Sequence, residues 1–324
     1  MPVPDAEVSQ LDVAAATHRI AGWVRRTPVL EVTVGGRPVR LKLEFLQHTG
    51  SFKARGAFNH LLAAAEMDAL PEVGVVAASG GNAGLAFAYA ASRLGVPAEV
   101  FLPASAPAVK LRKLHALGAR VVQYGTEYAA ADQAARDRQA ETGALFCHPY
   151  DLPEVVAGQG TLGVELADQL GDDLDTVLVA VGGGGLLAGV ATALAGTAAV
   201  VGVEPFAAAT LYAALEAGGP ADVPVGGVAA DSLGARRVGR IAYQVATRCE
   251  VGTALVTDDA IVAARRWLWD RCRIAVEHGA AAPLAALATG AYLPERDERV
   301  AVVLCGANTD PSDLAADPAA DPAG

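Results

Sequence analysis

The segment that decides the fold spans residues 176–189 and reads TVLVAVGGGGLLAG. Its first six residues form an apolar run that predicts a buried strand, and the apolar residues from Leu186 onward predict a helix. The four glycines at 182–185 join the two. Unhindered backbone N–H groups at the start of a helix can converge on an anion such as a phosphate. The segment therefore predicts an α/β sheet with an anion site at the end of one strand.

Two series of alternating strands and helices extend from this segment. In the first, strands are expected at 39–45, 74–78, 97–102 and 119–124, with helices at 52–66, 82–95, 107–117 and 127–141. In the second, strands are expected at 144–147, 175–181, 198–203, 252–256 and 299–304. The intervening helices are long enough to cross over between parallel strands. We therefore expect an α/β protein with two open, mainly parallel, twisted sheets.

The same series predict where the lobes begin and end. Residues 1–38 are expected to add an N-terminal helix and strand to the large lobe, and a Ser9-x-x-Asp12 capping pattern starts that helix, which we expect over 9–25. Residues 39–145 are expected to form the small lobe and 146–314 the large lobe. The last residues, 315–324, are rich in Ala, Asp and Pro and predict a disordered tail.

Composition narrows the class of protein. The formal net charge of −11, from 25 Lys and Arg against 36 Asp and Glu, disfavours a nucleic-acid binder, which requires a basic face. No apolar run reaches the roughly 18 residues of a membrane span, and no leader pattern precedes the first helix. The four cysteines show no metal-ligand spacing. We expect a cytoplasmic protein that binds a small molecule and neither nucleic acid nor membrane.

Two further segments carry candidate chemistry. Residues 50–56 read GSFKARG, and Lys53 lies there beside Phe52 and ahead of an apolar helix face. A partly desolvated amine has a lowered pKa and can be nucleophilic, although an exposed surface lysine is the common alternative. Residues 79–84 read SGGNAG, follow an apolar strand and open a helix. They predict a second anion site, one in each lobe.

The glycine loop alone allows two other interpretations. Gly183-x-Gly185-x-x-Ala188 also satisfies a loose dinucleotide fingerprint, and Glu204 ends the next apparent strand where a ribose-binding acid would lie. A nicotinamide-dependent oxidoreductase is therefore a competing hypothesis. A tight strand-to-helix turn without any ligand is the other.

Taken together, these segments resemble the β-family (fold type II) of pyridoxal 5′-phosphate (PLP) enzymes, whose fold is like that of the tryptophan synthase β-subunit. The serine/threonine dehydratase group is the most similar. The match covers most of the chain and includes AGQGT at 157–161, VEP at 203–205, SLG at 232–234 and CGAN at 305–308, in the family's order and spacing. The resemblance implies a PLP site in the cleft between the lobes.

It also implies a role for each motif residue. Lys53 would form the Schiff base with PLP and act as the catalytic base, Phe52 would pack against the ring, and Asn82 would hydrogen-bond the ring's 3′-oxygen. The phosphate would lie against Gly182, Gly183, Gly184, Gly185 and Leu186. The substrate carboxylate would lie against Ser79, Gly80, Gly81, Asn82 and Ala83, near Tyr150. Cys305 would face the ring nitrogen; a buried structural cysteine is its alternative interpretation.

Departures from the family pattern refine this expectation. Asn82-Ala83, Tyr150 and Cys305 resemble animal-type L-serine dehydratases. Gly80 stands where racemases of the group carry a serine, which disfavours racemisation. A divalent-cation site is only partly matched: Glu204 and the Ala208 carbonyl are available, but Thr210 stands where a second acid is usual.

The combined interpretation is a PLP-dependent ammonia-lyase that acts on L-serine, L-threonine or a related β-hydroxy amino acid, as a homodimer. Four alternatives stay open at this point. Two are reactions on the same fold, namely racemisation and elimination from 3-hydroxyaspartate or a specialised β-hydroxy amino acid. The third is the NAD-dependent oxidoreductase. The fourth is a ligand-binding domain that kept the fold without turnover.

Overall fold

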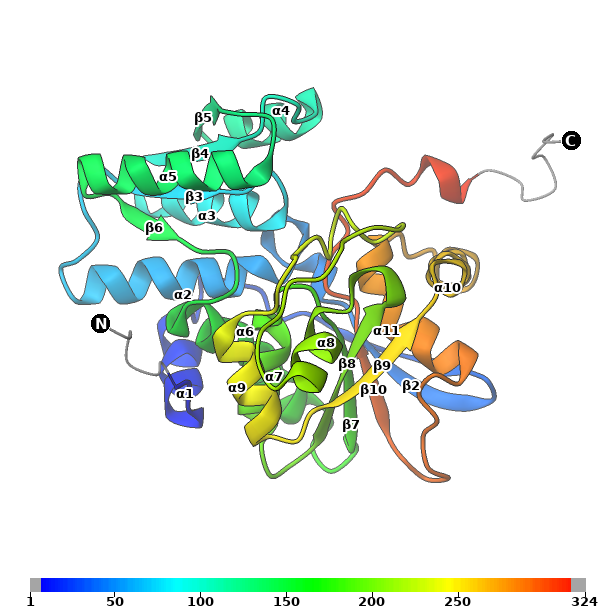
Figure 1. The fold of residues 1–324 in the computed structure, drawn as a ribbon. Helices are drawn as coiled ribbons and strands as arrows, with labels where there is room; N and C mark the ends of the chain where they lie inside the picture. The colour runs from blue at the N-terminus through cyan, green and yellow to red at the C-terminus, as the bar shows by residue number, and fades with distance from the viewer. Residues whose placement is uncertain (1–6, 316–324) are drawn as a thin grey trace, which may run out of the picture.

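The described part of the chain, residues 7–315 of a computed structural model, folds into two lobes with one sheet each (Figure 1). The six-stranded sheet has the order β1-β2-β10-β7-β8-β9 and the four-stranded sheet the order β5-β4-β3-β6. All neighbouring pairs are parallel except β1 and β2. The expected α/β fold with two mainly parallel sheets is therefore confirmed.

The strands lie close to their expected positions. In the large sheet they are β1 Val29–Val34, β2 Arg37–Lys42, β7 Thr176–Ala180, β8 Ala199–Pro205, β9 Gly252–Val256 and β10 Val300–Val303; in the small sheet they are β3 Val75–Ala78, β4 Ala98–Leu102, β5 Arg120–Gln123 and β6 Leu145–Cys147. All residues of β3, β7 and β10 are buried. Continuous apolar runs form such strands because helices cover both faces of the sheet.

The helices fill the intervals between strands. The small lobe contains α2 Lys53–Glu66, α3 Asn82–Leu94, α4 Ala108–Ala116 and α5 Tyr128–Thr142. The large lobe contains α1 Gln10–Arg19, α6 Pro153–Leu170, α7 Gly185–Leu194, α8 Thr210–Ala217, α9 Arg240–Arg248, α10 Asp258–Cys272 and α11 His278–Thr289. Helices α2 and α6 pack against each other and join the lobes (Figure 1).

Two strands pair in a different sheet from the one expected from the sequence. Strand β2 was expected to open the small lobe at residue 39, but it pairs with β10 in the large sheet. The reason is the Gly35-Gly36 turn, with φ of 57° and 81°, which folds β2 into a hairpin with β1. Strand β6 pairs with β3 in the small sheet, although it was expected in the second series. Strand alternation shows that a strand exists but not which sheet it joins.

The first helix confirms its start and corrects its end. Ser9 and Asp12 form the expected capping box. Helix α1 stops at Arg19 rather than residue 25, and Gly22 follows with a φ of 80° that a helix does not allow. The expected tail at 315–324 lies outside the described residues except for residue 315. Residues 1–6 of the N-terminal segment also lie outside them.

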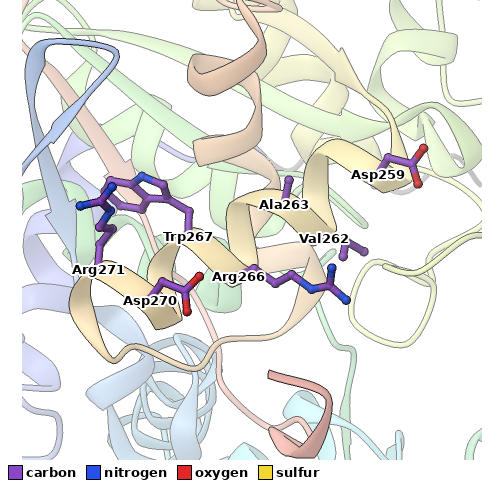
Figure 2. A pocket seen from close by; sticks show the side chains of 7 residues that line it. All are labelled: Asp259, Val262, Ala263, Arg266, Trp267, Asp270 and Arg271. Atoms are coloured by element: carbon purple, nitrogen blue, oxygen red, sulfur yellow. The ribbon is translucent and has the colours of Figure 1, made fainter. Parts of the chain in front are cut away.

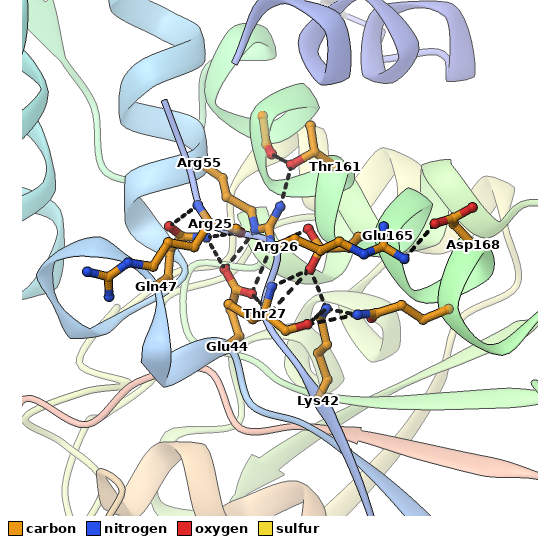
Figure 3. A network of polar contacts seen from close by, with 12 residues as sticks. Arg25, Arg26, Thr27, Lys42, Glu44, Gln47, Arg55, Thr161, Glu165 and Asp168 are labelled. Atoms are coloured by element: carbon orange, nitrogen blue, oxygen red, sulfur yellow. Dashed lines mark hydrogen bonds and ion pairs between the residues drawn. The ribbon is translucent and has the colours of Figure 1, made fainter. Parts of the chain in front are cut away.

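A buried cluster of charges ties helix α2 to the large lobe (Figure 3). The guanidinium of Arg55, 1% exposed, donates to both oxygens of Glu44 at 2.7 and 2.9 Å and to Glu165 of α6 at 2.9 Å. Lys42 of β2 also pairs with Glu165, and burial is the main influence that lowers the Lys42 pKa. Because Arg55 lies two residues after Lys53, this cluster fixes the start of α2.

We expect Glu44→Ala to destabilise the protein by about 3 to 5 kcal/mol, because it leaves the buried Arg55 guanidinium short of charge compensation. Glu31 is the matched control: its pair with Arg40 is 3.3 Å long and Glu31 is 63% exposed, so Glu31→Ala should cost less than about 1 kcal/mol. Urea unfolding of both variants measures the difference. Equal losses would contradict a structural role for the cluster.

Candidate active site

Lys53 lies where the two lobes meet. The segment before it is held against the end of β10, since the Phe52 N–H donates to the Cys305 carbonyl at 3.0 Å and Ser51 forms a β-bridge with Gly306. The Lys53 ammonium donates to the Pro149 carbonyl at 2.6 Å and lies 4.9 Å from the centroid of the Phe52 ring. The fold thus brings Cys305 next to Phe52 and Lys53, from which it is far apart in the sequence.

The Lys53 amine has no carboxylate partner among the described residues. Its side chain keeps some exposed area, but the ammonium lies among protein atoms, and this burial lowers its pKa to about 8, although the Glu277 carboxylate acts in the opposite direction. About a tenth of the amine is therefore neutral at pH 7, far more than for an exposed lysine with a pKa near 10.4. Neutral amine is the form that attacks a carbonyl or accepts a proton.

The glycine loop follows β7 and leads into α7. A Cβ at Gly183 would lie 2.3 Å from the Tyr150 ring, and one at Gly185 would lie 2.6 Å from the Tyr150 carbonyl, so side chains are excluded. Gly184 adopts a φ of 82°. In the described residues, the N–H groups of residues 182–185 donate to no protein acceptor. The loop is thus a set of free donors at a helix start, which suits a phosphate, and Leu186 lies buried just behind it.

The loop at 79–83 follows β3 and opens α3. Gly81 is the helix cap, its N–H lies 3.4 Å from the Ser79 hydroxyl, and Ala83 is buried. A Cβ at Gly80 would meet Leu102. From the neighbouring helix α4, Lys110 reaches across to the large lobe and pairs with Asp231 at 2.9 Å. The loop therefore lies at the carboxyl end of the small sheet, where ligands bind in open α/β sheets.

Asn82 contacts a residue that the sequence reasoning missed. Its Nδ2 donates to both oxygens of Glu277, at 2.9 and 3.0 Å, and its Oδ1 accepts from Asn308 at 2.7 Å. Glu277 is 7% exposed, and burial raises its pKa. The sequence holds one weak signal for Glu277: it is a single acidic residue that follows the short apolar segment Ile274-Ala275-Val276 and precedes a helix.

Cys305 follows β10 and is 6% exposed. Burial raises the pKa of its thiol, with the Glu277 carboxylate acting in the same direction. The thiol therefore stays neutral at physiological pH.

Glu204 is engaged by protein donors. Its carboxylate accepts from the Leu211 and Tyr212 N–H groups, at 2.8 and 2.9 Å, and from the Thr210 hydroxyl at 3.1 Å. It therefore caps the start of α8. Ala208 lies in the short turn just before that helix, and the described residues hold no cluster of three or more side chains suited to a metal. The residues at this position do not fit an acid-rich cation site.

A hollow of about 560 Å³ lies on helix α10, lined by residues that include Trp267, Arg266 and Asp270 (Figure 2). None of the motif residues lines it. It is therefore separate from the site around Lys53.

A family model described as "Pyridoxal-phosphate dependent enzyme" matches residues 20–306, which include both glycine loops, Lys53 and Cys305. The chain belongs to this family. Its cofactor is PLP, held by a lysine Schiff base in the family, and the buried amine and the free N–H groups of residues 182–185 fit that group. The family match decides against the dinucleotide interpretation of the glycine loop.

Relatives within the family indicate the reaction. The chain is 40% identical to a phenylserine dehydratase from Ralstonia pickettii, over 94% of each chain. It matches a crystal structure of threonine deaminase from T.th. with a TM-score of 0.84 and 40% identity, over 93% of this chain and 99% of that one. Maize serine racemase matches with a TM-score of 0.88 and 29% identity, over 95% of each chain. This PLP enzyme is a lyase that carries out β-elimination.

No helix among residues 7–315 is long and apolar enough to cross a membrane.

We expect divalent cations to have little effect on this PLP enzyme, because the Glu204 carboxylate is occupied by the start of α8. Chelator treatment should change activity less than about twofold and leave the melting temperature nearly unchanged. Activity assays and thermal melts with EDTA, then with added magnesium or calcium, measure this. A large loss that either ion restores would show that Glu204 leaves its helix to bind metal.

Proposed function

We propose that this enzyme eliminates water from a small L-β-hydroxy amino acid, L-serine, L-threonine or a related compound. The released enamine then takes up water and yields a 2-oxo acid and ammonia, so that the net reaction is the loss of ammonia. The observation that carries the proposal is the Lys53 amine, buried between the lobes without a carboxylate partner in the described chain. The dehydratase and deaminase relatives support the same reaction class.

Each motif has a part in this reaction. When bound, PLP draws electron density from the substrate's α-carbon and so weakens the α C–H bond. Lys53 Nζ, neutral over a useful pH range, accepts the α-proton as general base. The free N–H groups of residues 182–185 hold the cofactor phosphate, and the loop at 79–83 holds the substrate carboxylate. These fixed donors orient the α C–H bond toward Lys53 without rearrangement during the reaction.

Cys305 favours elimination over slower routes. Its neutral thiol supplies no fixed negative charge at the position proposed to face the ring nitrogen. The electron-withdrawing power of the site is therefore moderate, and prompt loss of the β-hydroxyl is favoured over reactions such as transamination, which require a long-lived carbanion.

Substrate choice within the class is the finer part of the proposal. The Ralstonia relative is named for phenylserine, an aryl substrate, whereas the solved T.th. relative is named for threonine. Tyr150, stacked over the Gly183 backbone, is the aromatic side chain we propose beside the substrate. We also propose that the enzyme works in the cytoplasm. We propose that it is a homodimer there, and light scattering after size-exclusion chromatography tests this oligomeric state.

We expect the purified holoenzyme to form ammonia and a 2-oxo acid from one or more of L-serine, L-threonine and β-phenylserine. A panel of these with 3-hydroxyaspartate, assayed for both products, ranks the substrates by kcat/KM. Turnover of none of them would contradict the proposal and favour a binding domain. A strong preference for 3-hydroxyaspartate would move the assignment to that alternative.

We expect the wild type to form little D-serine, because racemisation needs an acid on each face of the α-carbon and Gly80 offers none. Gly80→Ser should increase D-serine formation. The added Cβ would lie 2.8 Å from Leu102 Cδ2, the end of a flexible side chain, so the loop can accommodate it after a small shift. Chiral chromatography of the products measures both. Efficient interconversion of L- and D-serine by the wild type would favour racemase.

A further inference from the structure

The Glu277 carboxylate accepts hydrogen bonds from two segments that are distant in the sequence. It precedes α11 and its own N–H donates to the Gly306 carbonyl at 3.0 Å. Its carboxylate accepts from Asn82 at the start of α3 and from the Asn308 N–H at 2.9 Å. Since these partners of the carboxylate all donate, the ionised carboxylate matches its surroundings, whereas a protonated one would lack an acceptor for its O–H.

The contacts of Asn82 determine which way its amide points. Asn308 Nδ2 donates to the Thr49 carbonyl at 2.7 Å and to Asn82 Oδ1 at 2.7 Å. Glu277 and the Thr49 carbonyl, at the two ends of this chain, can only accept. If the Asn82 amide were rotated by 180°, its oxygen would face the carboxylate and its nitrogen would face the Asn308 amide nitrogen. Only one orientation satisfies all the groups.

This orientation leaves one Asn82 N–H over. The two Glu277 oxygens lie in nearly the same direction from Nδ2, whereas the two N–H bonds of an amide diverge widely, so one N–H serves both oxygens. Among the described residues Nδ2 has no other acceptor, and its second hydrogen is available to a ligand. Asn82 belongs to the small lobe, whereas Glu277 and Asn308 belong to the large lobe. The contacts therefore also hold α3 at a set distance from the end of β10, where Cys305 and Lys53 lie.

We propose that Glu277 is a positioning residue: it holds the Asn82 amide so that an N–H, not an oxygen, meets the bound cofactor, and it places a negative charge near the Lys53 nitrogen. The charged groups around it are Lys53, Lys113 and Asp231, with the neutral Cys305 thiol alongside. The inference depends on cofactor binding and not on the identity of the substrate.

The direct test is Glu277→Gln, measured without substrate. A glutamine would turn an amide nitrogen toward one of the donors, so Asn82 loses its set orientation and the PLP dissociation constant should rise about tenfold. The visible band of the lysine-linked cofactor disappears as the pH is raised. Because the variant lacks the negative charge, the midpoint of this titration should fall by about one pH unit. Glu277→Asp, which keeps the charge, should stay closer to the wild-type midpoint.

The matched control is Glu298→Gln, which removes a part-buried carboxylate near the opposite end of β10, where it accepts from the Glu295 N–H. It should leave both readouts at wild-type values. Asn82→Ala completes a double-mutant cycle: in that background Glu277→Gln should raise the PLP dissociation constant less than about twofold further.

Three outcomes would overturn the inference: an unchanged dissociation constant and midpoint in Glu277→Gln, effects that simply add to those of Asn82→Ala, or equal effects in Glu298→Gln. None of these would touch the proposed reaction, which is measured separately as product formation.

Discussion

The buried amine of Lys53 is the constraint on which the rest of the site depends. A charged ammonium is costly to bury without an opposite charge, and here desolvation brings its pKa down to about 8. The surrounding structure holds the amine in place all the same: the backbone bond from Phe52 to Cys305 fixes it beside the end of β10, and the Arg55 cluster fixes the helix that carries it. An amine held in this way is ready to bind a carbonyl cofactor.

The other lysines of the chain emphasise this point. The sequence has four, at positions 42, 53, 110 and 113. Lys42 and Lys110 have carboxylate partners and Lys113 is exposed to solvent, so each has a counter-ion or water beside its charge. Lys53 and Arg55, two positions apart, thus differ sharply: Lys53 lacks a counter-ion among the described residues and is the amine proposed to react, whereas Arg55 has two carboxylate partners and holds the helix.

Much of this could be predicted from the sequence, and the remainder has a physical reason. Apolar runs and crossover lengths predicted α2 to within a residue, because these signals are local. The sheet to which β2 or β6 belongs depends on hydrogen bonds between distant segments, which alternation does not encode. Motif spacing led to Lys53, Asn82 and the glycine loop. Glu277 has no spacing signature, since its partners come from residues 82 and 308, and only the folded chain brings them to it.

The central claim is that Lys53 holds the cofactor, and chemical trapping tests it most directly. Borohydride reduction of the holoenzyme, followed by proteolysis and mass spectrometry, locates the lysine that carries the reduced pyridoxyl group. We expect a single modified peptide containing Lys53, with loss of the visible band. A pyridoxyl group on Lys42, Lys110 or Lys113 instead, or no modified lysine in a protein that retains the band, would contradict it.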